Sequence, residues 1–454
     1  MQFKEYVHDL SDKLGQKQVS NNCFELANKI VASGDSQLWK LSCNHNEYNN
    51  FHHILDGKLK TTLTSEKTNV CLLARQNDYF KSKDMVVVLH DPSTIRKPES
   101  RTAENLCLVK DLDNNLVNGY MTYNCVAVEL DSSRVKLLRS VPYSTEQPEY
   151  VTQEELRAAA AGKLTPKRTA RIKELQDSNK LINLRTIALD SVDAIGKQVH
   201  ETNKEALVIH IFDRGFDDDA LLAGINGTGD YLVIRMKLNR NSNEVTMSRD
   251  GVETPVKLRN LRPAGSFEKT YAKVRFKNRT FTNALGVFEW NYLDTKQGSY
   301  SVVHARFYSS SGKKIFAEPM LLVTNFDVAC EQVAMLVFEM YMTRSRIEGV
   351  FKFCKENLGW ENSRIPDFEC VKNLLTLIFF VAGYYYEIED ELTKDETMIW
   401  LAKLGNCKGR VSHTYILRGL EVLVHYAIAK QFMAENNITD EQVYDILNSS
   451  KLNI

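Results

Sequence analysis

Four side chains that can bind phosphate groups or metal ions recur at fixed gaps near the middle of the C-terminal half. Tyr341 is followed after two residues by Arg344, after three more by Glu348, and after six more by Lys355. The surrounding periodicity predicts one long helix over residues 328–357, on which these side chains fall within about 60° of one another. A carboxylate in a row with a phenol, a guanidinium and an ammonium suits chemistry on phosphates. The alternative interpretation is an ion-paired, solvated helix face.

Two upstream aspartates stand where a carboxylate can lie at the edge of a sheet. Asp91 stands just past the apolar run 85–89, and Asp213 directly follows the apolar run 206–212. Continuous apolar runs are typical of central strands covered on both faces. A helical stripe over 184–199 precedes the second run, which predicts parallel strands with sites beyond their carboxyl ends. An aspartate before proline is also a common turn residue, and this is the alternative for Asp91.

The gaps from Tyr341 to Lys355 resemble the Tyr-Arg-Glu-Lys signature of cut-and-paste insertion-sequence transposases of the DDE class, in the branch often called family four. All four residue types match without a slip. The resemblance covers about residues 84–360. It implies an α/β fold with a ribonuclease-H-like mixed sheet flanked by helices, interrupted by a β-rich insertion, with helical N- and C-terminal regions.

The resemblance also implies that Asp91, Asp213 and Glu348 are the three catalytic carboxylates. Three carboxylates at one site repel each other unless a cation is present. Hard oxygen ligands favour Mg²⁺ or Mn²⁺ over zinc. Two such ions, roughly 3.5–4 Å apart, can activate an attacking oxygen and stabilise the leaving oxygen of a phosphodiester. We therefore assign these three side chains as ligands of two ions.

The remaining signature residues are expected to hold DNA phosphates; they are Tyr341, Arg344 and Lys355. Segment 257–279 contains eight Lys or Arg residues against one acidic residue. It predicts a surface for the phosphate backbone, with a plain polar sheet face as the alternative. Our DNA-binding candidates from this segment are Arg275, Lys277 and Arg279. The charged residues 150–180 predict a surface helical hairpin that is either a solvated insertion or a DNA contact.

The family's reaction, as the resemblance implies it, proceeds through several steps on DNA. The transposon end is nicked by hydrolysis, the freed 3′-OH attacks the opposite strand to form a hairpin, the hairpin is opened, and the ends are joined to target DNA. The implied partners are double-stranded DNA, as terminal inverted repeats and as target, and a second copy of the chain in a synaptic homodimer. In a well-studied branch a tryptophan stacks on a base flipped out during hairpin formation. Met320 holds that place here, and Trp290 is the nearest aromatic substitute.

Length and composition set wider bounds. The chain has 454 residues, 43% of them apolar and 26% charged, which is typical of a globular protein with two or three domains. Its net charge of zero excludes a uniformly cationic coat. Nine cysteines without a CxxC pair, no secretion signal and no apolar run of bilayer length predict a cytoplasmic protein that does not enter a membrane.

We expect five consecutive regions. They are a helical DNA-end-binding domain at 1–80, the first part of the catalytic core at 81–236, the β-rich insertion at 237–325, the second part of the core with the Glu348 helix at 326–365, and a helical C-terminal region at 366–454 that is a candidate for dimerisation.

Two other functions fit the same residues. A structure-specific nuclease of the ribonuclease-H type would share the carboxylates, and an inactive DNA-binding remnant of a mobile element would retain the fold. The sequence contains no GxxxxGK phosphate loop, which disfavours an ATP-driven mechanism.

Overall fold

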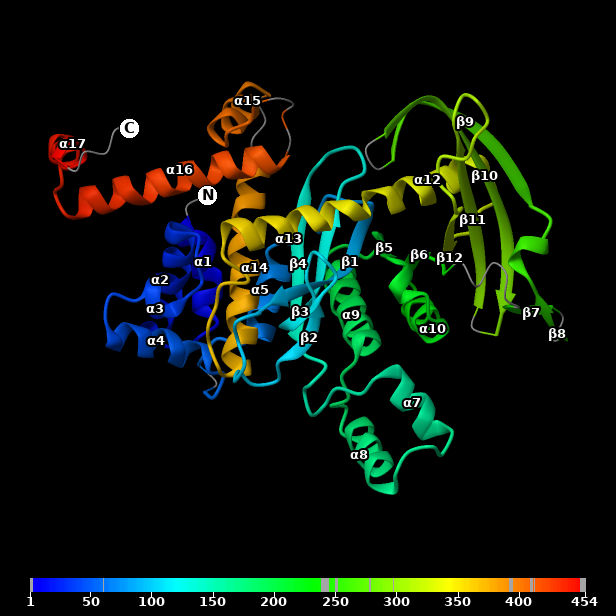
Figure 1. The fold of residues 1–454 in the computed structure, drawn as a ribbon, viewed down its shortest axis with the longest axis horizontal. Helices are drawn as coiled ribbons and strands as arrows, with labels where there is room; N and C mark the ends of the chain where they lie inside the picture. The colour runs from blue at the N-terminus through cyan, green and yellow to red at the C-terminus, as the bar shows by residue number, and fades with distance from the viewer. Residues whose placement is uncertain are drawn as a thin grey trace. The chain divides into compact units, whose positions relative to one another are not determined.

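The apolar run at 85–89 begins strand β1 (Met85–Arg96) in a ten-stranded mixed sheet of the described residues. The other strands of this sheet are β2 (Cys107–Lys110), β3 (Leu116–Val128), β4 (Val135–Tyr143), β5 (Leu207–Phe212), β6 (Tyr231–Arg235), β9 (Gly265–Phe276), β10 (Arg279–Thr295), β11 (Gly298–Tyr308) and β12 (Met320–Thr324). The computed structural model, drawn in Figure 1, describes residues 3–59, 61–237, 245–249, 252–276, 279–296, 298–391, 395–408, 411 and 413–449.

The strands are ordered β2-β3-β1-β5-β6-β12-β11-β10-β9, and β4 pairs with β3. The pairs β1–β5 and β5–β6 are parallel, whereas β2–β3 and β3–β4 are antiparallel. Helices α9 (Leu184–Thr202) and α10 (Asp219–Thr228) precede β5 and β6 and make the crossovers between parallel strands. A meander followed by two helix-linked parallel strands is the ribonuclease-H-like arrangement, so the expected fold class is confirmed.

The β-rich segment after β6 extends the core sheet. Strand β12 pairs antiparallel with β6, with Val323 opposite Ile234, and β11, β10 and β9 follow outward from β12. Strand β6 would otherwise leave a row of unpaired N–H and C=O groups along its outer side. Strands β7 (Val245–Arg249) and β8 (Val252–Val256) form a separate two-stranded sheet.

Contacts divide the chain into two compact units. The sheet unit comprises Leu72–Thr94 and Asn105–Glu348, and the helical unit comprises Met1–Cys71, Ile95–Glu104 and Gly349–Ile454. Besides α9 and α10, the helices within the sheet unit are α6 (Asn77–Lys81), α7 (Gln153–Ala160), α8 (Pro166–Asp177) and α12 (Glu331–Met342). Helices α7 and α8 form the expected hairpin over 150–180, with a Thr152–Glu155 capping box and Pro166 in the first turn of α8.

The helical unit is built around one apolar helix, α14 (Phe368–Glu391). Tyr6 donates a hydrogen bond to the carbonyl of Phe380 at 2.6 Å, and Trp360 donates to that of Leu375 at 3.0 Å. By its length and composition α14 is the single helix among the described residues that could cross a membrane, but 89% of its most apolar stretch is buried inside the protein. This burial is the pattern of a core helix.

The other helices of this unit come from both ends of the chain. They are α1 (Phe3–Asp12), α2 (Lys17–Ser33), α3 (Leu38–Leu41), α4 (His45–Leu55), α15 (Asp395–Leu404), α16 (His413–Glu435) and α17 (Asp440–Ser449). Two helices cross the boundary between the units in sequence, namely α5 (Ser65–Ala74) and α13 (Arg346–Asn357).

The helix predicted over 328–357 is interrupted, which corrects our expectation. Helix α12 ends at Met342, a 3-10 turn spans Thr343–Ser345, and α13 begins at Arg346. The Thr343 hydroxyl donates to the carbonyl of Met340 at 2.7 Å, and such local bonds compete with the helical ladder. Arg344 lies within this interruption.

Candidate active site

The two aspartates lie in register at the end of the central strand pair. Strands β1 and β5 are paired from Met85 opposite Leu207 to His90 opposite Phe212, and Asp91 and Asp213 are the next residues on each strand. We expected β1 to end at Asp91, but it continues to Arg96. The pairing with β5 has stopped by then, so the proline after Asp91 leaves no bond of that ladder unmade.

Both aspartates point to the face of the sheet that α12 covers. Side chains alternate along a strand, so Asp91 shares a face with Leu89, and Asp213 shares a face with Ile211. Helix α12 contacts β6, β12 and β11. The α9 and α10 side instead packs against the alternate residues, such as Val88. The strand register therefore aims both carboxylates toward the segment that carries the signature residues.

Arg344 connects two of the three predicted carboxylates. Its Nη2 lies 2.7 Å from Asp91 Oδ2, and its Nη1 lies 2.7 Å from Glu348 Oε1. The second pair spans four residues, one turn of helix, and the first joins residues 253 positions apart in sequence. The Arg344 side chain is 20% exposed and that of Glu348 is 58% exposed. Asp91 and Glu348 are thus held to one guanidinium.

Tyr341 brings Asp213 into the same group. Its hydroxyl donates to Asp213 Oδ1 at 3.3 Å. Burial and the charge of Asp213 raise the pKa of Tyr341 to about 12, although Arg235 and Arg344 act in the opposite direction. The phenol therefore stays protonated at neutral pH and acts as a hydrogen-bond donor.

The electrostatics of Asp91 show that negative charge is crowded at this place. Burial, together with the charges of Asp213 and Glu348, raises the pKa of Asp91 to about 6 against the lowering effect of Arg344. For Arg344, burial lowers the pKa, but the three carboxylates outweigh it and raise the pKa above its usual value. The site holds three acidic side chains around one partly buried arginine.

The three carboxylates of this site are chemically suited to a divalent metal ion. Three carboxylates supply the hard oxygen atoms that Mg²⁺ and Mn²⁺ prefer. As arranged around Arg344, however, no three His, Cys, Asp or Glu side chains of the described residues lie close enough to ligate one ion. The carboxylates must close together for that, and the guanidinium stands between Asp91 and Glu348.

The acidic run 217–219, just after Asp213, serves the backbone at the start of a helix. Asp218 is the N-cap of α10 and accepts from the amide of Leu221 at 3.1 Å. It also pairs with Arg185 at 2.6 Å. Asp217 accepts from the amide of Lys237 at 2.8 Å.

Lys355 belongs to the helical unit. There its Nζ lies 3.5 Å from Glu361 Oε1, and Arg96 makes a 2.5 Å ion pair with the same carboxylate. Burial and the nearby Arg96 lower the pKa of Lys355 against the raising effect of Glu361. Lys355 stands seven residues after Glu348 on α13.

The basic strand residues lie on the outer strands of the sheet. Arg275 on β9 and Arg279 on β10 are exposed, and Lys277 lies outside the described residues. Arg275 borders a cavity of about 590 Å³ that Met320 also lines. Trp290 is buried against Gly265 instead and does not line this cavity.

The cavity combines aromatic walls with cationic side chains, which the sequence did not reveal. Its apolar lining residues include Tyr271, Phe276, Phe307, Phe316, Phe338, Met320 and Met342. Its cationic ones are Arg235, Lys273 and Arg275. Arg235 also acts on the Tyr341 phenol, so the cavity adjoins the carboxylate group. Alternation along β9 could have indicated the aromatic face, but not its partners on β11 and α12.

A buried chain of polar groups beneath Asp91 was also missed. The Tyr123 hydroxyl lies 2.9 Å from His90 Nδ1, and His90 Nε2 lies 2.8 Å from His210 Nδ1. His210 Nε2 lies 3.1 Å from Asp230, whose other oxygen lies 2.8 Å from His200. Neutral histidines protonated at Nε2 satisfy the whole chain. It ties β1, β5, the residue before β6 and α9 together.

Comparison with known proteins adds a family. Residues 178–383 match the family model described as the transposase DDE domain. The matched segment begins just before α9 and ends within α14, so it contains Asp213, Tyr341, Arg344 and Glu348. No curated protein matches the chain.

Proposed function

We propose that the chain, a DDE-class insertion-sequence transposase by its match to the transposase DDE domain over residues 178–383, performs cut-and-paste transposition of DNA. It cleaves DNA at the transposon ends and joins those ends to target DNA. The single observation that carries this proposal is the gathering of Asp91, Asp213 and Glu348 around Arg344 on one face of a ribonuclease-H-like sheet.

DDE domains depend on metal ions, and we propose that Asp91, Asp213 and Glu348 hold two Mg²⁺ or Mn²⁺ ions. When bound, two such ions supply charge for an attacking and a leaving oxygen at a phosphodiester. The chain's own residues orient the DNA. Tyr341 stays protonated at neutral pH and keeps its hydroxyl available to a phosphate oxygen, and the exposed side chain of Glu348 can reach toward an ion from α13.

We place the protein in family four on the signature Tyr341, Arg344, Glu348 and Lys355. The proposed phosphate contacts are those residues other than Glu348, together with Arg275 and Arg279, whose exposed side chains lie at the ends of β9 and β10. Lys277 remains a candidate from sequence alone. Arginine and lysine contacts of this kind position the duplex and carry no sequence readout.

The aromatic cavity supports a hairpin intermediate. An unstacked base needs a flat apolar wall and a polar rim, and the cavity offers Phe307, Phe338 and Met320 beside Arg235. Met320 would take the wedge role that tryptophan has in the well-studied branch. Replacing it with alanine should then reduce hairpin product while the first nick continues; equal hairpin yields from both proteins would exclude the role.

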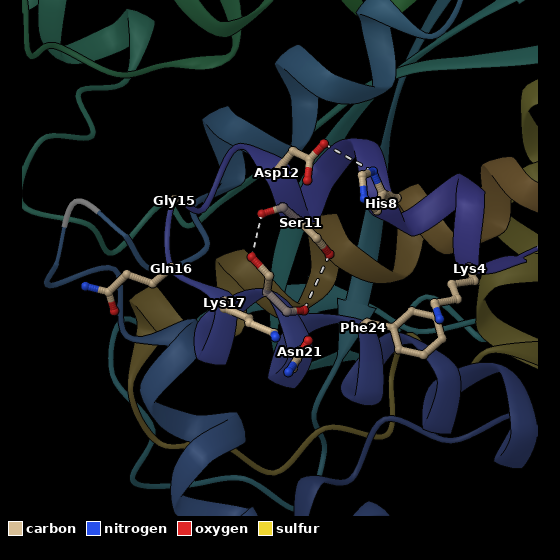
Figure 2. Close-up of a pocket in the computed structure, with 10 residues that line it drawn as sticks. Lys4, His8, Ser11, Asp12, Gly15, Gln16, Lys17, Asn21 and Phe24 are labelled. Carbon is tan, nitrogen blue, oxygen red and sulfur yellow. Dashed lines mark hydrogen bonds and ion pairs between the residues drawn. The ribbon is translucent and has the colours of Figure 1, made fainter.

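Residues 1–80 are proposed to bind the terminal inverted repeats. A surface pocket of about 390 Å³ lies between α1 and α2 (Figure 2), and its lining includes Lys4, His8, Asp12, Lys17 and Asn21. The Ser11 hydroxyl donates to the Ser20 carbonyl at 3.4 Å, and the Ser20 hydroxyl donates to the Ser11 carbonyl at 2.8 Å, so reciprocal bonds hold the two helices together at this pocket. Cations on joined helices suit a phosphate backbone. Residues 366–454 remain our candidate for dimerisation, and nine free thiols suit a cytoplasmic location.

One assay tests the function against its alternatives. Purified protein and Mn²⁺ are incubated with DNA that carries the element's own flanking inverted repeats and with a supercoiled target plasmid. Cleavage at the repeat ends together with joining to the plasmid is the expected result. Cleavage without joining would favour the structure-specific nuclease, and binding without cleavage would favour the inactive remnant.

A further inference from the structure

The Arg344 guanidinium occupies the space between two carboxylates that metal binding requires. Both of its terminal nitrogens lie at 2.7 Å from carboxylate oxygens, which is the length of a charge-assisted hydrogen bond. The two acceptors belong to β1 and α13, so the arginine is the described link between these carboxylates. It compensates their charge in the way that a bound cation would.

The surroundings of Arg344 also allow its guanidinium to leave the two carboxylates. Its Nε is buried without a hydrogen-bond partner, so Arg344 is held at its two terminal nitrogens and not at the root of the guanidinium. Arg344 sits in the 3-10 turn between α12 and α13, where the regular helical ladder is interrupted. A long side chain on such a turn can exchange one set of oxygen partners for another without unfolding a helix.

We infer that Arg344 is an exchangeable internal counter-ion, an inference that rests on the proposed metal site. Without divalent ions, the single positive charge of Arg344 partly offsets the charges of Asp91 and Glu348 and separates the two carboxylates. With divalent ions held by those carboxylates, the guanidinium would leave them and donate to a DNA phosphate. Metal binding and the phosphate contact of Arg344 then support each other, because a guanidinium left among metal-bound carboxylates would face cations instead of anions.

The inference predicts a gain of metal binding when the arginine is removed. In DNA-free protein, Arg344→Gln leaves the carboxylates without their competitor cation. Its Mn²⁺ dissociation constant should fall about tenfold or more, the size expected for one charge-assisted pair. The paramagnetic resonance signal of free Mn²⁺ measures this directly in a titration of the full chain.

Arg346→Gln is the matched control. Arg346 begins α13 two residues later, and its guanidinium donates to the main-chain carbonyl of Glu129 instead of a site carboxylate. The substitution changes the net charge by the same amount, so it should leave Mn²⁺ affinity at the wild-type value. Arg344→Lys keeps a charge but cannot span two carboxylates with a planar fork, and its affinity should lie between those of wild type and Arg344→Gln.

The same titration separates this inference from the metal site on which it rests. If Asp91→Asn and Glu348→Gln lose Mn²⁺ but Arg344→Gln gains none, the counter-ion role is wrong and the metal site stands. If the acidic variants bind Mn²⁺ as wild type does, the metal site and the counter-ion role both fail. If Arg344→Gln binds Mn²⁺ more tightly than wild type and the added Asp91→Asn substitution abolishes this gain, the metal site and the counter-ion role are both supported.

A second measurement tests the exchange toward DNA. Ca²⁺ or Mn²⁺ should raise the affinity of wild-type protein for DNA bearing the element's ends by severalfold, and should do so much less in Arg344→Gln. The urea unfolding midpoints of wild type and Arg344→Gln are compared, so that a folding defect is not mistaken for a loss of coupling between metal binding and DNA binding. An equal metal effect on DNA affinity in both proteins would overturn the release of Arg344 to phosphate.

Discussion

Glu348 is the carboxylate whose chemistry can be removed with least disturbance to the fold. Its side chain is 58% exposed and accepts from Arg344, so Glu348→Gln retains its shape and keeps a carbonyl acceptor for the same donor. We expect DNA cleavage to fall at least about a hundredfold, because the proposed metal ligand loses its charge, while binding of end DNA persists. Gel-based cleavage and binding assays on one preparation measure both.

The control for that variant is Glu356→Gln. Glu356 lies two turns later on α13 and pairs with Arg418 at the surface. Its replacement should leave cleavage unchanged. Wild-type cleavage by Glu348→Gln would remove this residue from the site.

We propose that Lys355 contacts a DNA phosphate, and such a contact makes the affinity for DNA depend on the salt concentration. Lys355→Ala should weaken DNA binding and lower the slope of log affinity against log salt by about one. Lys352→Ala, on the same helix with a 56% exposed side chain, serves as the control and should leave the slope nearly intact. A slope that is the same for Lys355→Ala and wild type would contradict a phosphate contact.

For single residues, the sequence predicted the positions of the aspartates better than it predicted which side chains they contact. Asp91 and Asp213 could be predicted to lie together, because each stands just past an apolar run and parallel strands align the ends of such runs. The bond of Arg344 to Asp91 could not be predicted, since the two residues are 253 positions apart and the choice between carboxylate and phosphate depends on the side-chain conformation.

Among the elements, α10 shows how an acidic run can belong to the backbone. Asp218 caps α10 and pairs with Arg185, so Asp218→Ala should lower the free energy of unfolding by about 1–2 kcal/mol. Asp218→Asn keeps the cap and should cost less. Both variants should cleave DNA at wild-type rates once folded, whereas Asp213→Asn should not. Loss of cleavage in a stable Asp218→Asn protein would move this residue into the site.

Element boundaries were where the sequence misled us. The apolar pattern continues through 328–357, and the break at Thr343–Ser345 rests on a hydroxyl bond that periodicity does not reveal. Similarly, an Asp-Pro pair suggested the end of β1, although proline is compatible with a strand once the neighbouring ladder has ended. Element types were predictable because the apolar runs are long; the places where they bend depend on single side chains.

For the molecule as a whole, the buried chain from His90 to Asp230 links stability to pH. Burial alone would raise the pKa of Asp230, but the hydrogen bonds that the rings of His210 and His200 donate to its carboxylate outweigh burial and hold the pKa below its usual value. A carboxylate with a lowered pKa stabilises the fold above its unfolded pKa of about 4 and ceases to do so as pH falls through its folded pKa.

Asp230→Asn should therefore lose about 2–3 kcal/mol of unfolding free energy at pH 7. The difference between wild type and variant should shrink as pH falls from 5 to about 3, as measured by urea unfolding at several pH values. A difference that stays constant across this range would mean that the carboxylate charge does not stabilise the fold.

The assembly of the helical unit from three separated segments lies beyond what sequence patterns can indicate. Residues 95–104 join 1–71 and 349–454 through pairs such as Arg96 with Glu361, and such distant contacts leave no local periodicity. Helicity at both ends of the chain was predictable from spacing. Their shared core around α14 was not.

The central claim is that three carboxylates from β1, the end of β5 and α13 hold divalent ions together. Anomalous X-ray scattering from crystals of the full chain with end DNA and Mn²⁺ tests it most directly. We expect two peaks about 3.5–4 Å apart, with oxygens of Asp91, Asp213 and Glu348 all within bonding distance. A Mn²⁺ peak that any one of these side chains does not touch, or peaks elsewhere on the protein, would contradict the account.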